Sequence, residues 1–504
     1  MCSMRPLLAL LAVLAAVLAA GCGGEQTATG TTAGAELAPR DAAVWVTADT
    51  DPGSGQWQAL TALLERIPGA SGALERLLAE GLEDEGLSWE EDVLPALGPA
   101  LVLVVPAGAE GGVVLTRPED GDKLRALAAR NEGTVLGERD GWTVVAESQE
   151  ALDAYERAIE EGTLAGDPDF GRATSGLPED ALATLYVDGA GLDGALARGA
   201  AQAGSALPGT ALPGTALPGI GVGGPLTGSA ASLGTVAAAV TAEEDGLRLV
   251  ALAAPETGLP DRFEPTLLGR VPADALAAVA FKGGDAVRSQ LDGVAGGPEL
   301  RQQLERGLGV SLDELAELLA GEGVLYVRAG APVPEVTLAL DGAGRRGVAL
   351  LDRLVERLGG LFSLGGAAPA LRPQTSTEDG VEVTRLELRD GVAIRWAAVG
   401  ETLLVTTGAG GIRAFRGDGA KLTGTEGFAR AAEDVGYEGE TNAFAFVDVD
   451  RLVPLLEGLA EQAQEGDDES LAEVAAALEA LDTVALNMRA EDGRLRIEGF
   501  LRVR

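Results

Sequence analysis

Carboxylates are the only abundant groups in this sequence that could carry out acid–base chemistry. The 504 residues include 78 Asp and Glu but no histidine. Ser-His-Asp or Cys-His nucleophiles and histidine metal sites are therefore ruled out. The three lysines, Lys123, Lys282 and Lys421, do not stand in a Ser-x-x-Lys or Walker motif. We expect no catalytic residue, no metal site and no cofactor, while a carboxylate-dependent hydrolase stays open as an alternative.

One acidic pair resembles the start of a calcium loop. Asp49 and Asp51 precede Gly53, as the first ligands of an EF-hand would. However, Leu60 occupies the position at which a bidentate Glu closes such a loop. Because the motif fails at its strongest ligand, turn and helix-capping roles are the favoured interpretation.

A second acidic pair, Asp448 and Asp450, resembles two catalytic carboxylates. Asp448 belongs to a segment that is similar to the one ending at Asp188, where Ala190 stands in place of the second acid. A helix N-cap at Asp448 and at Asp188 explains both segments better than catalysis does.

Two further patterns have structural explanations. Gly219, Gly221 and Gly224 fit Gly-x-Gly-x-x-Gly, but they lie in a Pro-Gly-rich segment with no strand before them, so phosphate binding is not expected. Four tryptophans could stack on sugars, yet most lie within apolar patterns, which favours core packing. These are Trp57, Trp89, Trp142 and Trp396.

The first 21 residues have the parts of a bacterial lipoprotein signal. Arg5 supplies the positive charge, an apolar run follows, and small residues precede Cys22, the expected site of lipidation. Ala19 stands where lipoprotein signals prefer Leu, and ordinary secretion is the alternative. Residues 22–36 then form a flexible tether. The protein is therefore expected at the extracytoplasmic face of the cell membrane, held by a lipid anchor.

Charge and cysteine content limit what the mature chain can bind. The formal net charge is −40, which excludes nucleic acid as a partner and repels anionic lipid headgroups. The other cysteine, Cys2, leaves with the signal, so the mature fold has no disulfide. The fold must then be stabilised by packing within large domains.

Apolar periodicity predicts alternating strands and helices. In the first part of the chain, helices are expected near 60–67, 74–82, 124–128 and 150–160, and a capping box in which Ser88 and Glu91 bond to each other's amides starts another. Strands are expected at 101–105, 113–116, 142–146, 183–188, 236–241 and 247–252. Asp-Gly at 140–141 is a hairpin turn signal.

The same order of segments recurs later in the chain. Residues 309–314 repeat 86–91, with Ser311 and Glu314 as the second capping box, and residues 443–448 repeat 183–188. A closing hairpin around 491–493 repeats the one around 243–246. Eight such matches in one order predict an internal duplication.

The matches divide the mature chain into two related halves. The first spans 37–254 and includes a mobile Pro-Gly loop at about 204–229, the linker spans 255–265, and the second half spans 266–504. We expect an α+β fold in which each half has a mainly antiparallel or mixed sheet with helices packed on one face.

Short segments of the first half resemble an uncharacterised bacterial family. These are 39–46, the helix start at 56–60 and the segment 91–98. They are similar to domain of unknown function 3352, which is common in actinobacteria, and the resemblance would span about 37–504. The family has no assigned activity, cofactor or catalytic residue, so the resemblance implies none here.

These patterns favour a non-enzymatic lipoprotein of the cell envelope that binds a partner or serves as a scaffold. A carrier of lipid or another amphiphile is the second hypothesis, and an apolar cavity between sheet and helices would support it. The carboxylate-dependent hydrolase is third. The oligomeric state is left open.

Overall fold

A computed structural model describes most of the chain. It covers residues 32–68, 86–107, 111–191, 234–255, 259–283, 309–364, 373–455 and 478–504, except 132, 332, 390 and 391, together with isolated positions between these ranges. The predicted signal, Cys22, most of the predicted tether and most of the predicted Pro-Gly loop lie outside the described residues. The predicted helix at 74–82 also lies outside them.

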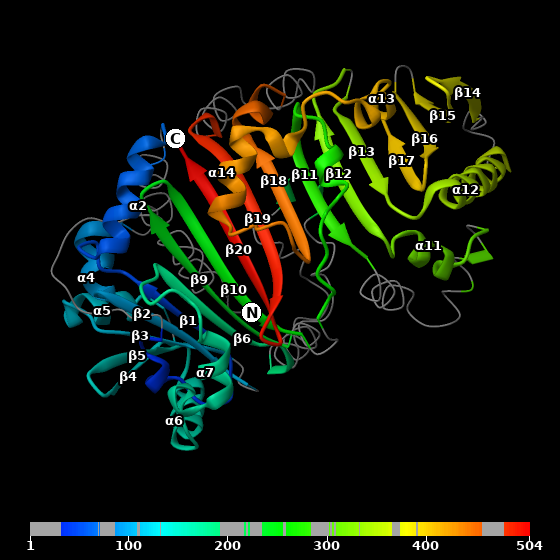
Figure 1. Ribbon diagram of the computed structural model, residues 1–504. Helices are drawn as coiled ribbons and strands as arrows, with labels where there is room; N and C mark the ends of the chain where they lie inside the picture. Colours follow the sequence, from blue (N-terminus) through cyan, green and yellow to red (C-terminus); the bar gives the residue numbers. More distant parts are fainter. Residues whose placement is uncertain are drawn as a thin grey trace.

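The described strands build one large sheet, which runs through the whole molecule (Figure 1). Before residue 260 its strands are β1 (Ala42–Asp49), β2 (Ala100–Pro106), β3 (Val113–Thr116), β4 (Val135–Arg139), β5 (Trp142–Ala146), β6 (Ala183–Asp188), β9 (Thr235–Glu243) and β10 (Gly246–Ala254). The later strands are β11 (Ala275–Lys282), β12 (Glu322–Arg328), β13 (Glu335–Leu340), β14 (Gln374–Glu378), β15 (Val381–Arg389), β16 (Val392–Val399), β17 (Thr402–Thr406), β18 (Ala443–Asp448), β19 (Leu481–Glu491) and β20 (Arg494–Val503). A separate two-residue pair joins β7 (Ala216–Leu217) and β8 (Ile220–Gly221).

All pairings between the named strands are antiparallel. The spatial order is β4-β5-β3-β2-β1-β6-β9-β10-β20-β19-β18-β11-β12-β13-β17-β16-β15-β14. The expected α+β class is therefore confirmed. The two halves do not carry separate sheets, because β10 pairs with β20 and joins them into one.

Helices cover one face of this sheet, here called the front face. They are α6 (Gln149–Glu160), α7 (Pro168–Thr174), α13 (Gly411–Arg416) and α14 (Glu426–Asp434). Phe170 on α7 packs against Trp45 and Tyr186, and Phe428 on α14 packs against Phe444 and Phe446. The two largest hydrophobic cores lie between these helices and the front face.

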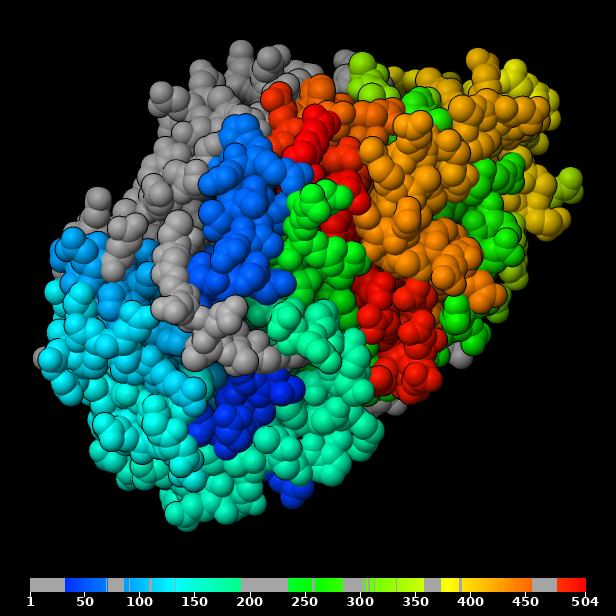
Figure 2. Space-filling model, turned by 60° about the vertical axis from the view of Figure 1, so that its left-hand side comes forward, coloured from blue at the N-terminus to red at the C-terminus, as the bar shows by residue number. Residues whose placement is uncertain are grey.

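Other helices lie on the opposite, back face, so the expectation of helices on one face only was wrong. They are α2 (Gly55–Arg66), α4 (Leu94–Leu97), α5 (Gly121–Ala128), α11 (Leu312–Leu318) and α12 (Gly344–Leu364). α4 and α5 pack near β2 and β3, and α11 and α12 pack near β13 and β17. α2 lies across the ends of β9, β10 and β20, where Trp57 contacts the cluster around Val503 (Figure 2).

Three of the hairpins close through the same two-residue turn. Asp140-Gly141, Asp379-Gly380 and Asp492-Gly493 each have φ near 49° at Asp and near 80° at Gly. Two positive φ values define a type I′ turn, whose twist suits an antiparallel hairpin and favours glycine at the second position. The sequence predicted the first and third turns, and the β14–β15 hairpin at Asp379 was missed.

The capping boxes differ between the two halves. Ser311 and Glu314 form the predicted reciprocal pair at the start of α11. Ser88 accepts from the Glu91 amide, but the carboxylate that accepts from the Ser88 amide, at 2.8 Å, belongs to Asp92. The segment that follows, η2 (Trp89–Val93), is a π-helix, in which the wider turn places residue 92 rather than 91 beneath the cap.

The strand registers of the two halves agree in detail. β1 pairs with β2 through an irregularity between Ala42 and Val44, and β11 pairs with β12 through one between Ala275 and Ala277. The amide of Leu164 donates to Ala38, and the amide of Leu422 donates to Val271, so the loop before α7 and the loop before α14 are held in the same way.

The junction between the halves is symmetric in register. Val250 in β10 faces Glu498 in β20, and each lies four residues after the start of its strand. Arg248 and Arg496, each two residues earlier, donate across the junction to carbonyl groups at the end of the opposite half's helix. Arg248 donates to Asp434 of α14 and Arg496 to Gly176 beyond α7. We call these two contacts the arginine clasp.

The clasp should contribute to the stability of the joined sheet. We expect Arg248→Gln to lower the free energy of unfolding by about 1–2 kcal/mol, because it removes a charge-assisted hydrogen bond to a helix end in a partly buried setting. Urea unfolding measures the change. Arg172→Gln is the control, since its ion pair with Asp169 is 76% and 69% exposed and its loss should have little effect. Equal losses in both variants would contradict a special role for Arg248.

Candidate functional site

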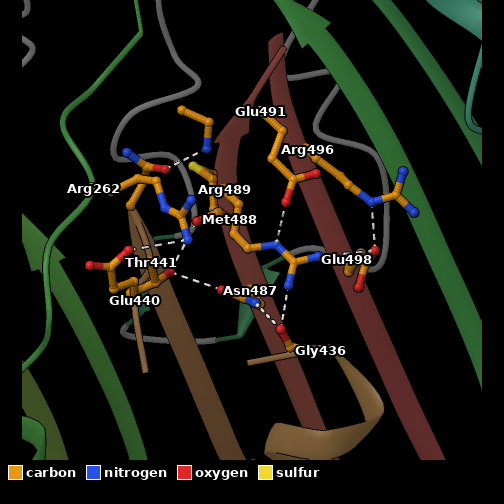
Figure 3. Close-up of polar contacts among 12 residues, drawn as sticks. Arg262, Gly436, Glu440, Thr441, Asn487, Met488, Arg489, Glu491, Arg496 and Glu498 are labelled. Carbon is orange, nitrogen blue, oxygen red and sulfur yellow. Dashed lines mark hydrogen bonds and ion pairs between the residues drawn. The ribbon is translucent and has the colours of Figure 1, made fainter. Parts of the chain in front are cut away.

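The middle of the front face carries a cluster of charged side chains from β19 and β20 (Figure 3). The guanidinium of Arg489 lies 3.4 Å from Glu498 and 3.3 Å from Glu491, and Arg496 lies 2.6 Å from Glu498. Antiparallel pairing places Arg489 opposite Arg496, and Glu498 is next to both. Each of these two arginines therefore has a carboxylate close by.

Amide and hydroxyl groups extend this cluster toward β18. The Thr441 hydroxyl lies 2.9 Å from the Asn487 side-chain oxygen, and the Asn487 amide donates to the carbonyl of Val435 at 3.1 Å. Asn442 accepts from the Ala490 amide and donates to Pro260 at 2.7 Å. These side chains are buried, so the hydrogen bonds stabilise the connection between α14, β18 and β19.

The cluster has the chemistry of a structural network rather than of an active site. Its carboxylates are paired with arginine, and its side-chain amides bond to backbone groups. Among the described residues, no group of three or more Asp, Glu, Cys or His side chains could hold a metal ion. Figure 2 shows the β19–β20 turn between α7 and the segment after α14, and Arg494 beside this turn donates to the carbonyl of Arg172 in α7.

A second charged group lies at the start of β11. Arg328 contacts Asp274 at 2.8 Å and Glu335 at 2.9 Å. Burial acts to raise the pKa of Asp274, but the hydrogen bond and positive charge of Arg328 outweigh it and hold the pKa below its usual value. Nearby, burial raises the pKa of Tyr326 to about 12, so its hydroxyl stays protonated at neutral pH.

Most of the acidic side chains singled out in the sequence accept hydrogen bonds from backbone amides. Asp49 accepts from the amide of Asp51 at 2.9 Å, and Asp51 accepts from the amide of Gly53 at 2.8 Å. Asp188 and Asp448 each accept from an amide just beyond their strand, at 3.3 and 3.1 Å. These bonds agree with the turn and cap interpretation. Asp450 pairs instead with Arg504 near the C-terminus.

Most of the tryptophans lie in the core, as predicted. Trp57, Trp142 and Trp396 are at most 4% exposed, and Trp89 is partly buried against the cluster around Val93. None of the three buried rings is open to a sugar. Of the glycine motif, Gly219 and Gly224 lie outside the described residues, as does Cys22.

A surface that sequence reasoning missed is the centre of the back face. In β1, β6, β9, β10, β11, β12, β18 and β20, every described residue that alternation and register place on this face is apolar. A water-facing sheet surface would alternate with polar residues. Many of these side chains are only half-buried, and Leu249 is 37% exposed. Examples are Val44, Val46, Leu185, Val187, Val236, Val240, Val279, Leu325, Leu495, Ile497 and Leu501, and Leu486 and Met488 of β19 lie on the same face.

A groove of about 610 Å³ lies at the start of α11, where Arg306, Ser311 and Arg357 line it together with Gln302 and Glu305. It is an open groove at the start of a helix and not a cavity enclosed between the sheet and its helices, so it does not match the apolar cavity expected of an amphiphile carrier. Within the described part of the chain, no helix is long and apolar enough to cross a membrane.

Comparison with known proteins identifies no relative. No protein family and no curated protein matches the sequence. Two solved structures, crystal forms III and I of TP0453, are similar over 45% of this chain and 81% and 80% of theirs, at 10% and 11% identity. The TM-score is 0.22 for both, too low to support an argument about fold or function.

The Asp274–Arg328 pair predicts a pH dependence of stability. Because the folded-state pKa of Asp274 is lowered, its contribution is present above the unfolded pKa of about 3.9 and is lost as pH falls below it. We expect Asp274→Asn to lower the melting temperature at pH 7 and to make little difference near pH 3. Asp122→Asn, which removes an 87% exposed partner, serves as control. A difference between wild type and Asp274→Asn that stays constant with pH would contradict this assignment.

Proposed function

We propose that this protein is a non-enzymatic lipoprotein of the cell envelope that binds a partner through the apolar centre of its back face. The back face carries the proposal, because a row of apolar side chains that stay partly accessible, with Leu249 37% exposed, suits an interaction site. The signal sequence and Cys22 support a lipid anchor at the extracytoplasmic face of the membrane. The arginine-paired carboxylates of the front face give no support to a carboxylate-dependent hydrolase.

We also propose that the chain arose by internal duplication, with the first half ending near residue 254. The matching irregularities in β1 and β11, the matching loop bonds of Leu164 and Leu422, and the symmetric junction at Val250 and Glu498 support this proposal. Membership of domain of unknown function 3352 stays a proposal based on the short motifs of the first half.

An amphiphile is a second candidate for the occupant of the back face. This hypothesis is favoured by the chemistry of the surface, since a row of Val, Leu and Ile side chains binds acyl chains without hydrogen-bonding requirements. A protein partner would instead bring its own apolar patch together with a polar rim.

Native mass spectrometry tests what the back face binds. The chain from residue 22, with Cys22→Ser and without detergent, is compared with the same sample after denaturation. We expect a lipid-sized adduct that disappears on denaturation if the occupant is an amphiphile. A native mass that equals the denatured mass would favour a protein partner, which pull-down from envelope extracts would then identify.

A matched pair of variants places the binding on the back face. Leu249→Lys should abolish adduct or partner binding, because it puts a charge in the middle of the apolar surface. Leu388→Lys changes an exposed leucine, 47% exposed, outside that surface and should leave binding intact. Binding that survives Leu249→Lys unchanged would refute the back face as the site.

A further inference from the structure

One row of front-face side chains is polar in the second half and apolar in the first half. In the second half, cross-strand pairing aligns Arg385 in β15, Arg395 in β16, Thr406 in β17 and Thr337 in β13, with Tyr326 in β12 next in line. All five are polar. The row crosses from β12 to β15, toward the outer edge of the sheet, and its Thr406 lies close to Gly411 at the start of α13.

The first half supplies an internal comparison. The positions that correspond to Arg395, Thr406, Thr337 and Tyr326 by strand register are Val135, Ala146, Val113 and Val104. Those four apolar residues pack in the core beneath α6. The same framework can therefore be completed with apolar side chains, so the polar row is not required by the fold.

The two arginines of this row face each other directly. Register places Arg385 opposite Arg395 on neighbouring antiparallel strands. Like charges at directly opposed positions destabilise a sheet. In a chain with twice as many acidic as basic residues, an Arg–Arg pair therefore needs a compensating anion.

The protein compensates this pair only in part. Arg385 lies 3.0 Å from Glu387, which is 50% exposed, while its Nε atom is buried and has no hydrogen-bond partner. Arg395 donates to the carbonyl of Thr407 at 3.3 Å. Among the described residues, no carboxylate lies within ion-pair distance of Arg395, and the nearby Glu335 is paired with Arg328. Of the two guanidinium groups, only that of Arg385 therefore has a carboxylate within ion-pair distance among the described residues, and that carboxylate is solvated.

We propose that Arg385 and Arg395 form a binding site for an anionic group of the phosphate or carboxylate type. Two adjacent guanidinium groups present planar, forked donors that match the oxygen atoms of such a group. Bound between them, the anion would offset the repulsion and supply an acceptor near Arg385. This site lies on the front face, so it is separate from the surface proposed to bind the partner.

Calorimetry with inorganic phosphate tests the site on the chain from residue 22, with Cys22→Ser. We expect binding that exceeds the effect of sodium chloride at equal ionic strength and weakens about tenfold or more in Arg395→Gln, since a charge-assisted hydrogen bond is lost. Arg385→Gln should weaken it similarly. Arg413→Gln is the control, because that arginine is 78% exposed and pairs with Asp379.

Two further experiments identify the source of the anion and test whether the arginines have only a structural role. Binding to phosphatidylcholine vesicles that contain phosphatidic acid, but not to free phosphate, would assign the site to a lipid headgroup if Arg395→Gln abolishes it. Arg395→Val restores the residue type of the first half and should raise or preserve the melting temperature without anion. Anion binding that is unaffected by Arg395→Gln and Arg385→Gln, or a stability loss in Arg395→Val, would overturn the proposal.

Discussion

The antiparallel pairing of β10 with β20 is the contact on which the rest of the architecture depends. Without it, each half would end in an unpaired edge strand, and long unpaired edges promote aggregation. The arginine clasp reinforces this pairing, because Arg248 and Arg496 each bind the end of a helix that belongs to the opposite half. Equivalent residues make equivalent bonds in both directions, as in a two-fold symmetric dimer. The two halves are therefore joined by strand pairing and by reciprocal hydrogen bonds, and not only by a linker between separate domains.

The two faces of the sheet differ in polarity at their centres. The centre of the front face carries paired charges and buried amides between α7 and α14, where Arg489 and Glu498 meet. The centre of the back face is apolar instead. Hydrogen bonds from charged groups on the front face thus join the halves, while the side chains at the centre of the back face are apolar and partly buried. That contrast separates the structural network from the surface that we propose for binding.

The matching strand registers also allow each half to serve as a reference for the other. Where Val135 and Val113 fill a core, Arg395 and Thr337 occupy the corresponding positions without disturbing the strand registers. The same strand arrangement therefore accommodates apolar side chains in the first half and polar side chains in the second. A comparison of this kind needs no relative outside the chain.

The sequence by itself determined the local elements. Apolar periodicity located most strands, Asp-Gly marked two of the I′ turns, and Asp448 was recognised as a cap, because these features depend on residues a few positions apart. Only the tertiary structure decided which strands become neighbours, so it alone revealed the β10–β20 junction, the helices on both faces and the apolar back face. It also showed that Arg385, in a strand that the sequence analysis did not predict, lies opposite Arg395. The Ser88 amide was likewise found to donate to Asp92 and not to Glu91. Those outcomes depend on register and on contacts between segments hundreds of residues apart, which local patterns do not encode.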